Sequence, residues 1–131
     1  MAETAVEPEL PLGLSTGAFW RANLLDCLEP IREAGFRRIE VSSSPSHLDF
    51  HDRAACAAAA QRIRALELEV HSFHAPFADH IDISALNSGR PDTAVREISR
   101  PAEAAAAVGA RYFVLHPGPE TSGVPRSERL D

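Results

Sequence analysis

The sequence contains little cysteine: only Cys27 and Cys56 occur among its 131 residues. The two cysteines do not form a CxxC pair, and they fall in two separate predicted helices. Because a disulfide framework needs several paired cysteines, the sequence excludes a disulfide-rich scaffold. Two isolated thiols are typical of a reducing compartment, so we expect the chain in the cytoplasm.

Long hydrophobic runs are also missing from the sequence. No stretch approaches the roughly 18 apolar residues that a membrane span requires, so we expect no membrane partner. Residues 1–10 carry three glutamates and no apolar run, which predicts an acidic lead-in and not a signal peptide. The alanine-rich stretch from Ala54 to Ala60 is interrupted by Cys56 and flanked by Arg53 and Gln61, which indicates part of a soluble helix.

The chain has no excess of positive charge. It carries 13 Lys+Arg against 19 Asp+Glu, a formal net charge of −6, and its isoelectric point is about 5.5. The basic residues are arginines scattered along the chain. Proteins that track a phosphate backbone usually present a basic face, so the composition disfavours nucleic acid as a partner.

The remaining composition is that of an ordinary folded domain. Hydrophobic residues make up 44% of the chain and charged residues 24%, which excludes a disordered segment. The length corresponds to one domain and is sufficient to bury a core.

Short apolar runs alternate with helical patterns along the chain. Strands are predicted at residues 12–16, 38–42, 69–73 and 111–115, and helices at residues 24–34, 53–66 and 93–108. Asp52 and Asp92 are the expected N-caps of the second and third helices. Pro30 predicts a kink or a late start in the first helix, and Pro101 lies awkwardly within the third.

Strands that alternate with helices predict an α/β fold with a parallel sheet. The spacing of about 30 residues per unit favours (β/α) TIM-barrel-type units. A doubly wound open sheet is the alternative, but no GxGxxG or P-loop motif is present. A complete barrel needs about 250 residues. We therefore expect about four of the eight units here, which is a half barrel, and truncation is the expected reason. The expected divisions are an acidic lead-in (1–10), the partial barrel (11–120) and a polar tail that begins an incomplete helix (121–131).

Two histidines follow predicted strands and precede prolines. His74 begins a His-Ala-Pro sequence and His116 a His-Pro-Gly sequence. In a barrel the carboxyl ends of the strands, here also including Thr16 and Glu40, face the active site. Two neutral imidazoles on adjacent strands suit a divalent metal, particularly alongside carboxylates. The alternative is that each histidine is a hydrogen-bonded packing residue.

Glu40 stands inside an apolar run, where a carboxylate is costly unless it is paired or functional. It could bind substrate or orient a ligand at the mouth of the barrel, or it could form a buried salt bridge with Arg37 or Arg38. Both interpretations remain open at the level of sequence.

The other histidines are expected outside the metal pair, although the acidic loop around His80 could contribute outer hydrogen bonds to the site. His71 lies three residues before His74, so strand alternation predicts that it packs against a helix. His47, His51 and His80 lie in or near loops and are expected at the surface.

Three short sequence segments resemble those of a known family: Arg38 to Val41, Ser72 to Phe77 and Val114 to Gly118. They resemble the second, third and fourth strands of the xylose-isomerase-like TIM barrels, and the resemblance extends from Leu12 to Glu120. That superfamily includes sugar and sugar-phosphate isomerases and epimerases, and apurinic repair nucleases of the endonuclease-four type.

The resemblance implies metal-assisted proton transfer next to a carbonyl of a small sugar or sugar phosphate. It places His74 and His116 where members with several metals have imidazole ligands, with Mn²⁺, Zn²⁺, Co²⁺, Fe²⁺ or Mg²⁺ as the candidate ions, and leaves Glu40 as a substrate-binding candidate. The catalytic carboxylates of many epimerases lie on later strands, so no catalytic residue is assigned here and the chain is expected to carry only the N-terminal half of the site.

Two alternatives accompany this expectation. One is a repair nuclease of the same superfamily, in which the two histidines help to hold a metal cluster. The other is a non-catalytic half barrel or pseudo-enzyme. An open half barrel also exposes two strand edges, through which it could self-associate.

Overall fold

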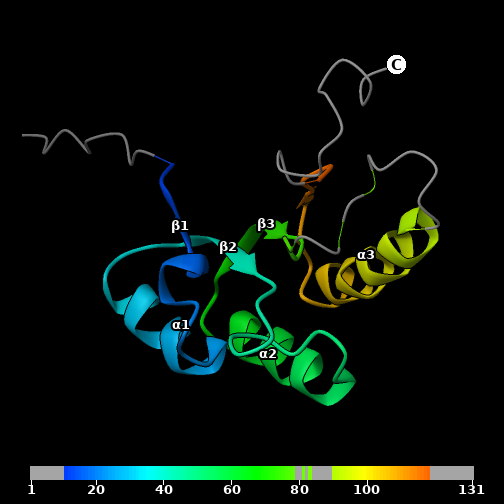
Figure 1. The fold of residues 1–131 in the computed structure, drawn as a ribbon. Helices are drawn as coiled ribbons and strands as arrows, with labels where there is room; N and C mark the ends of the chain where they lie inside the picture. The colour runs from blue at the N-terminus through cyan, green and yellow to red at the C-terminus, as the bar shows by residue number, and fades with distance from the viewer. Residues whose placement is uncertain (1–10, 79–80, 82, 84–89, 119–131) are drawn as a thin grey trace, which may run out of the picture.

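A computed structural model describes residues 11–78, 81, 83 and 90–118 of the chain, without the side chains of residues 90–94. The strands are β1 (Gly13–Ser15), β2 (Arg38–Ser42), β3 (Glu69–His74) and β4 (Tyr112–Val114). They form one sheet in the order β1-β2-β3-β4, and every neighbouring pair is parallel (Figure 1). All four predicted strands are therefore confirmed.

The helices are the short 3₁₀ helix η1 (Thr16–Phe19), α1 (Leu24–Glu33), α2 (Arg53–Ala65) and α3 (Arg90–Ala107). α1, α2 and α3 all lie on one side of the sheet (Figure 1). A doubly wound sheet has helices on both faces, whereas sequential parallel strands with helices on one side are the arrangement of a barrel wall. The described residues therefore form half of a (β/α) barrel, as the spacing predicts.

Side-chain caps explain where two of the helices begin. The Asn23 carboxamide accepts a hydrogen bond from the backbone of Leu25, and Asp52 accepts two from the first turn of α2. The expected cap at Asp52 is thus confirmed. The expected cap at Asp92 is wrong, because α3 begins at Arg90. Proline is favoured in the first turn of a helix, where its missing N–H leaves no bond unmade, so the Pro that precedes Asp92 does not delay the helix.

The structure can be compared with what was expected for the two prolines inside helices. α1 begins six residues before Pro30, so the expected late start is wrong. Pro101 lies inside α3, as expected from the sequence, and its side chain is completely buried.

All three helices end in the same way before the next strand. The residues Gly35, Glu67 and Gly109 have φ angles of 94°, 53° and 77°. In each case the amide of the following residue bonds back to a carbonyl five positions earlier, as in Phe36 to Ile31 (3.3 Å). This left-handed cap satisfies carbonyls that the helix end would leave unpaired. Glycine adopts this conformation without strain, but Glu67 does not.

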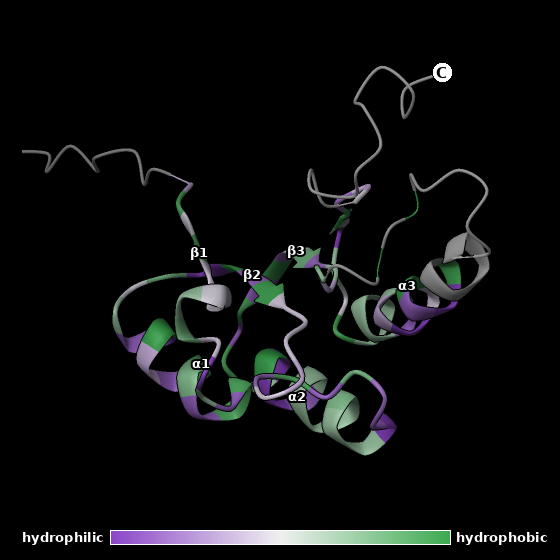
Figure 2. Ribbon diagram, viewed as in Figure 1, coloured by the Kyte–Doolittle hydropathy of each residue, from purple (hydrophilic) through white to green (hydrophobic). Residues whose placement is uncertain are grey.

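The core lies between the helices and the sheet, where apolar residues are concentrated (Figure 2). Strand residues that face the helices, such as Ile39, Val41 and Phe73, are fully buried. They pack in one cluster with Leu24, Leu28, Ile31, Ala59, Ile63, Ala104 and Val108 from the three helices. This burial orders the strands and therefore holds the opposite, inner face of the sheet in place.

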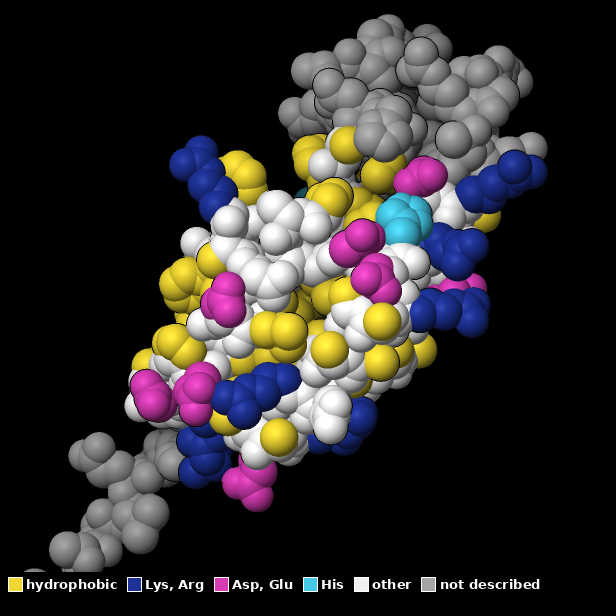
Figure 3. Space-filling view, turned by 90° about the horizontal axis from the view of Figure 1, so that it is seen from below, with side chains coloured by type: hydrophobic (Ala, Val, Ile, Leu, Met, Phe, Trp, Pro, Cys, Tyr) yellow, Lys and Arg dark blue, Asp and Glu magenta, His cyan; other side chains and the backbone are white. Residues whose placement is uncertain are grey.

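The charged side chains on the surface are of both signs, as the composition of the sequence leads one to expect. On the face seen in Figure 3, basic and acidic side chains are interspersed. Among the described residues, no helix is long and apolar enough to cross a membrane. The expected lead-in (1–10) and tail (121–131), and His80, lie outside the described residues.

Candidate functional site

His74 and His116 lie side by side above the inner face of the sheet. Their Nε2 atoms are 3.1 Å apart, although the residues are 42 positions apart in the sequence. His74 is the last residue of β3, level with Ser42 and Val114 on the two neighbouring strands. His116 stands two residues beyond Val114. The parallel sheet therefore brings together two imidazoles from the carboxyl ends of adjacent strands.

One imidazole of the pair has a defined orientation. The Nδ1 atom of His74 is 2.9 Å from the carbonyl oxygen of Ala75. Because a carbonyl can only accept, Nδ1 carries the proton in this bond and Nε2 of His74 presents a lone pair. The His116 ring also lies against Phe77, with the ring centroids 4.9 Å apart. Apolar contact and hydrogen bonding therefore hold both rings at the mouth of the half barrel.

The separation of the two Nε2 atoms matches the distance between two ligands of one metal ion. With metal–nitrogen bonds of about 2.1 Å, two ligands are about 3.0 Å apart at a right angle and about 3.4 Å apart at a tetrahedral angle. The observed 3.1 Å falls within this range. The Nδ1–H bond to a carbonyl is also the usual outer contact of a metal-bound imidazole. The pair therefore fits a divalent metal, although no third His, Cys, Asp or Glu joins it within the described residues.

Glu40 occupies the next level down on the inner face. Its two carboxylate oxygens accept hydrogen bonds from Ser15 (2.8 Å) and Ser72 (2.9 Å). Both serines are its register partners on the neighbouring strands. The three side chains thus form a polar layer across β1, β2 and β3, about 7 Å below the level of His74 at the usual rise of a strand.

The salt bridge considered for Glu40 is not formed. Arg38 pairs with Glu69 (3.3 Å), which also pairs with Arg111 (3.2 Å). The hydrogen bond from Arg111 is the main cause that lowers the pKa of Glu69, and Arg38 adds to it. No ion pair involves Glu40 among the described residues. Each of its oxygens accepts one side-chain bond, so each has capacity for a further donor.

His71 does not pack against a helix, contrary to expectation. Its side chain is exposed, and its ring lies against Tyr112, with the centroids 5.0 Å apart. The register between β2 and β3 shifts by one residue at this point. An extra residue of this kind breaks the alternation of a strand, so counting in twos from His74 predicts the wrong face.

His47 is not at the surface either. It is only 1% exposed, and its Nδ1 atom is 2.7 Å from the carbonyl oxygen of Ala22. The backbone amide of Leu24 donates to its carbonyl oxygen (2.8 Å), which ties the loop after β2 to the start of α1. A tertiary contact, which loop composition does not report, therefore buries this ring. His51 is exposed, as expected.

Thr16, the remaining strand-end residue, has a structural role in the sheet. Its side chain is fully buried, and its hydroxyl accepts a hydrogen bond from the backbone amide of Ser42 (3.0 Å). It therefore continues the β1–β2 ladder where β1 has ended. The serines at positions 15 and 72 are site residues that the sequence analysis overlooked; small polar residues level with Glu40 on both neighbouring strands are the signal that could have identified them.

Comparison with solved structures confirms the barrel class. A D-tagatose 3-epimerase-like protein superposes on 90% of this chain with a TM-score of 0.71 and 25% sequence identity. A D-psicose 3-epimerase crystallised in the presence of D-fructose gives 0.69 over 89% of this chain, with 13% identity. A xylose isomerase domain protein from Planctomyces limnophilus gives 0.63 over 95%, with 19% identity. No family model and no curated protein matches the sequence.

These comparisons confirm the expected resemblance to xylose isomerase-like TIM barrels at the level of the fold. The chain spans 42% to 48% of the length of the three solved structures. That coverage is consistent with an N-terminal half barrel.

Proposed function

We propose that this chain forms the N-terminal half of the site of a sugar or sugar-phosphate isomerase or epimerase. The observation that carries the proposal is the 3.1 Å contact between the Nε2 atoms of His74 and His116, at the carboxyl ends of adjacent parallel strands. The likeness to solved structures of 3-epimerases supports the reaction class.

In this proposal His74 and His116 bind a divalent metal ion through Nε2. Zn²⁺, Mn²⁺, Co²⁺ and Fe²⁺ are the ions best matched to imidazole, and Mg²⁺ is a poorer match. The contact between His74 and the Ala75 carbonyl keeps the lone pair of Nε2 directed at the ion. When bound, the metal would polarise a carbonyl oxygen of the substrate and so ease removal of the adjacent proton.

Glu40 is proposed to bind a hydroxyl of the substrate. Ser15 and Ser72 hold the carboxylate in one orientation, and its oxygens retain free lone pairs. Glu40 lies two positions before Ser42, which is level with His74, so a small sugar can reach from the histidine pair towards it. The proton-transferring carboxylates are proposed to come from outside the described residues.

Metal titration of the full chain tests the ligand assignment. We expect binding of Zn²⁺ or Co²⁺, measured by calorimetry and by the visible spectrum of Co²⁺. His74→Ala and His116→Ala should each weaken it by at least about tenfold, which is the effect of disturbing even outer contacts of a metal site. His51→Ala, an exposed histidine outside the pair, is the matched control. Unchanged affinity in both pair variants would refute the assignment.

Substrate binding is tested separately with the metal-loaded chain. D-Fructose should shift NMR signals of β2 and β3, and Glu40→Gln should reduce those shifts without changing metal affinity. We expect no epimerisation by the chain alone, because the proton-transferring carboxylates are proposed to lie outside these four strands. Conversion of D-fructose by the purified chain would contradict the half-site part of the proposal while supporting the reaction class.

Self-association is proposed as a second property, because two edges of the sheet carry no further strand among the described residues. β1 and β4 each have only one neighbour in the sheet. Leu12 beside β1 and Tyr112 on β4 are more than half exposed, at 63% and 56%. Pairing of β4 with β1 of a second copy would cover both edges and close eight strands. A monomer across a concentration series in sedimentation analysis would contradict this arrangement.

The repair-nuclease alternative is less well supported. Arg38 and Arg111 are both engaged by Glu69, and the net charge of the chain is −6. Salt-dependent binding of an abasic DNA duplex is the result that would favour it. A cytoplasmic location is also proposed, since Cys27 and Cys56 are buried, unpaired thiols in different helices.

A further inference from the structure

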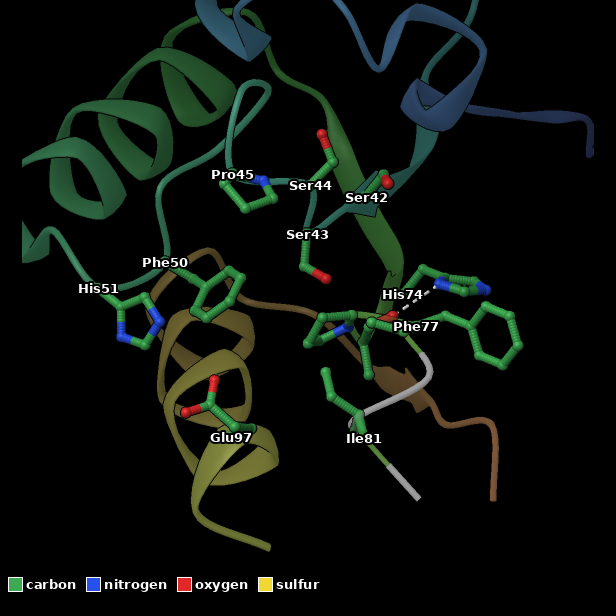
Figure 4. Close-up of a pocket in the computed structure, with 13 residues that line it drawn as sticks. Ser42, Ser43, Ser44, Pro45, Phe50, His51, His74, Phe77, Ile81 and Glu97 are labelled. Atoms are coloured by element: carbon green, nitrogen blue, oxygen red, sulfur yellow. Dashed lines mark hydrogen bonds between the residues drawn. The ribbon is translucent and has the colours of Figure 1, made fainter. Parts of the chain in front are cut away.

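A cavity lies at the carboxyl ends of β2 and β3, between these strand ends and α3. Its volume is about 390 Å³, towards the lower end of the range of about 300–1,000 Å³ for small-molecule sites. It is bordered by the loop that follows β2, the start of the loop that follows β3, and α3 (Figure 4). Apolar side chains form most of its wall, among them Pro45, Phe50, Pro76 and Ile81.

Strand alternation separates this cavity from the candidate site above. The ladder continues past the strand ends, because the amide of Ser43 donates to the His74 carbonyl (3.2 Å) and the amide of Ala75 to the Val114 carbonyl (2.9 Å). Ser43 and Ala75 therefore face the helices, whereas Ser42 and His74 face the inner side. His74 borders the cavity, but its imidazole points away from it (Figure 4).

The floor of the cavity contains an unpartnered hydroxyl group. Ser43 is only 1% exposed, and its Oγ has no hydrogen-bond partner among the described residues. In Figure 4 the hydroxyl points into the cavity, beside Phe50. A buried hydroxyl without a partner is destabilising, so its presence calls for a group that completes its bond.

The wall formed by α3 contributes a carboxylate. Glu97 is partly buried and its side chain is directed into the cavity (Figure 4). It forms no ion pair within the part of the chain that the structure describes. His51 lies at the rim, and among the described residues no arginine lines the cavity. The polar groups of the wall therefore favour a cation over an anion.

We propose that this cavity binds a small amine with an apolar body and a hydroxyl group. The hydroxyl bonds to Ser43, the apolar body packs between Phe50 and Pro76, and the ammonium group lies beside Glu97. The ligand is compact because the cavity admits little more than one ring with a short chain. The proposal does not rest on the function of the histidine pair, since Ser43 and Glu97 are not part of that pair, although His74 and Phe77 border both sites.

Three matched probes test the assignment on the full chain by NMR titration. Tyramine carries both polar groups, phenethylamine lacks the hydroxyl, and 4-hydroxyphenylpropionate carries a carboxylate in place of the amine. We expect tyramine to bind about three- to tenfold more tightly than phenethylamine, which is the usual worth of one hydrogen bond. The carboxylate probe should bind most weakly. Equal binding of the three probes, or no binding, would overturn the proposal.

Two variants assign the contacts to residues. Ser43→Ala should abolish the preference for tyramine over phenethylamine while leaving phenethylamine binding unchanged. Glu97→Gln should weaken both amines and reduce discrimination against the carboxylate probe. Glu103→Gln, an exposed carboxyl on the same helix, is the control and should change nothing. Circular dichroism establishes that each variant is folded, and a tyramine preference that survives Ser43→Ala would also overturn the proposal.

Discussion

Nε2 of His116 lies 3.1 Å from Nε2 of His74, and Nδ1 of His74 lies 2.9 Å from the carbonyl oxygen of Ala75. The two contacts use both nitrogens of one ring. They define which atoms of the pair carry protons when the rings are neutral and metal is absent.

Opposite tautomers are therefore expected for the two histidines. His74 should carry its proton on Nδ1, because it donates to the Ala75 carbonyl. His116 should carry its proton on Nε2, because it donates to the lone pair of His74. The imidazole ¹⁵N chemical shifts of the metal-free chain, at a pH where both rings are neutral, measure this directly. His74 with its proton on Nε2 would contradict the geometry.

The serine contacts of Glu40 should contribute to stability. Ser72→Ala removes a hydrogen bond to a partly buried carboxylate and is expected to lower the free energy of unfolding by about 1 kcal/mol. Urea unfolding of the single variants and of Ser72→Ala/Glu40→Gln measures the coupling. In the Glu40→Gln background the effect of Ser72→Ala should be smaller. Additive effects of the two changes would show that the residues do not interact.

Glu69 should make folding sensitive to acid. Its pKa is lowered in the folded chain, mainly by the hydrogen bond from Arg111 and further by Arg38. The stabilising contribution is therefore fully present above the ordinary glutamate pKa of about 4.3. It is lost as pH falls through the lowered pKa of the folded state.

Urea unfolding of the full chain and of Glu69→Gln at several pH values measures this effect. The stability difference between them should be constant near neutral pH and should shrink in acid. A difference that does not change with pH would contradict the assigned cause.

Glu67 provides a route to a more stable chain. It has a φ of 53° at a position where the other two helices have Gly35 and Gly109. A left-handed backbone conformation costs about 1–2 kcal/mol for a residue with a Cβ. Glycine removes this cost, but part of the gain is lost because glycine makes the unfolded chain more flexible. Glu67→Gly should therefore raise the free energy of unfolding by about 0.5–1 kcal/mol.

Thermal and urea unfolding check the Glu67 prediction. Glu67→Ala is the matched control, because alanine retains the Cβ and should gain little. Gly35→Ala should be destabilising for the same reason. A loss of stability in Glu67→Gly would show that the glutamate side chain contributes more than its backbone strain costs.

Much of the fold follows from local patterns in the sequence. The run from Arg38 to Ser42 alternates with the period of a strand and forms β2 without change of its ends. Asp52 precedes an apolar helical pattern and caps α2. Such signals depend on neighbouring residues only, so they can be recognised without the tertiary structure. The predicted start of α3 is three residues too late, because more than one residue in that stretch can begin a helix.

The partners of the site residues could not be derived in this way. The contacts of Glu40 with Ser15 and Ser72 join three strands, and the alignment of Ser72 with Glu40 depends on a register shift beside His71. The burial of His47 depends on the carbonyl of Ala22, 25 residues away. Each of these features requires the relative positions of segments that are distant in the sequence.

The sequence alone determined the order of strands and helices and the placement of two histidines at strand ends, because turn residues and hydrophobic periodicity act locally. Only the tertiary structure decided which side chains meet. Parallel pairing of β3 with β4 brings His74 to His116. The same alternation turns Ser43 to the opposite face, where its unpartnered hydroxyl is directed into the cavity that α3 also borders.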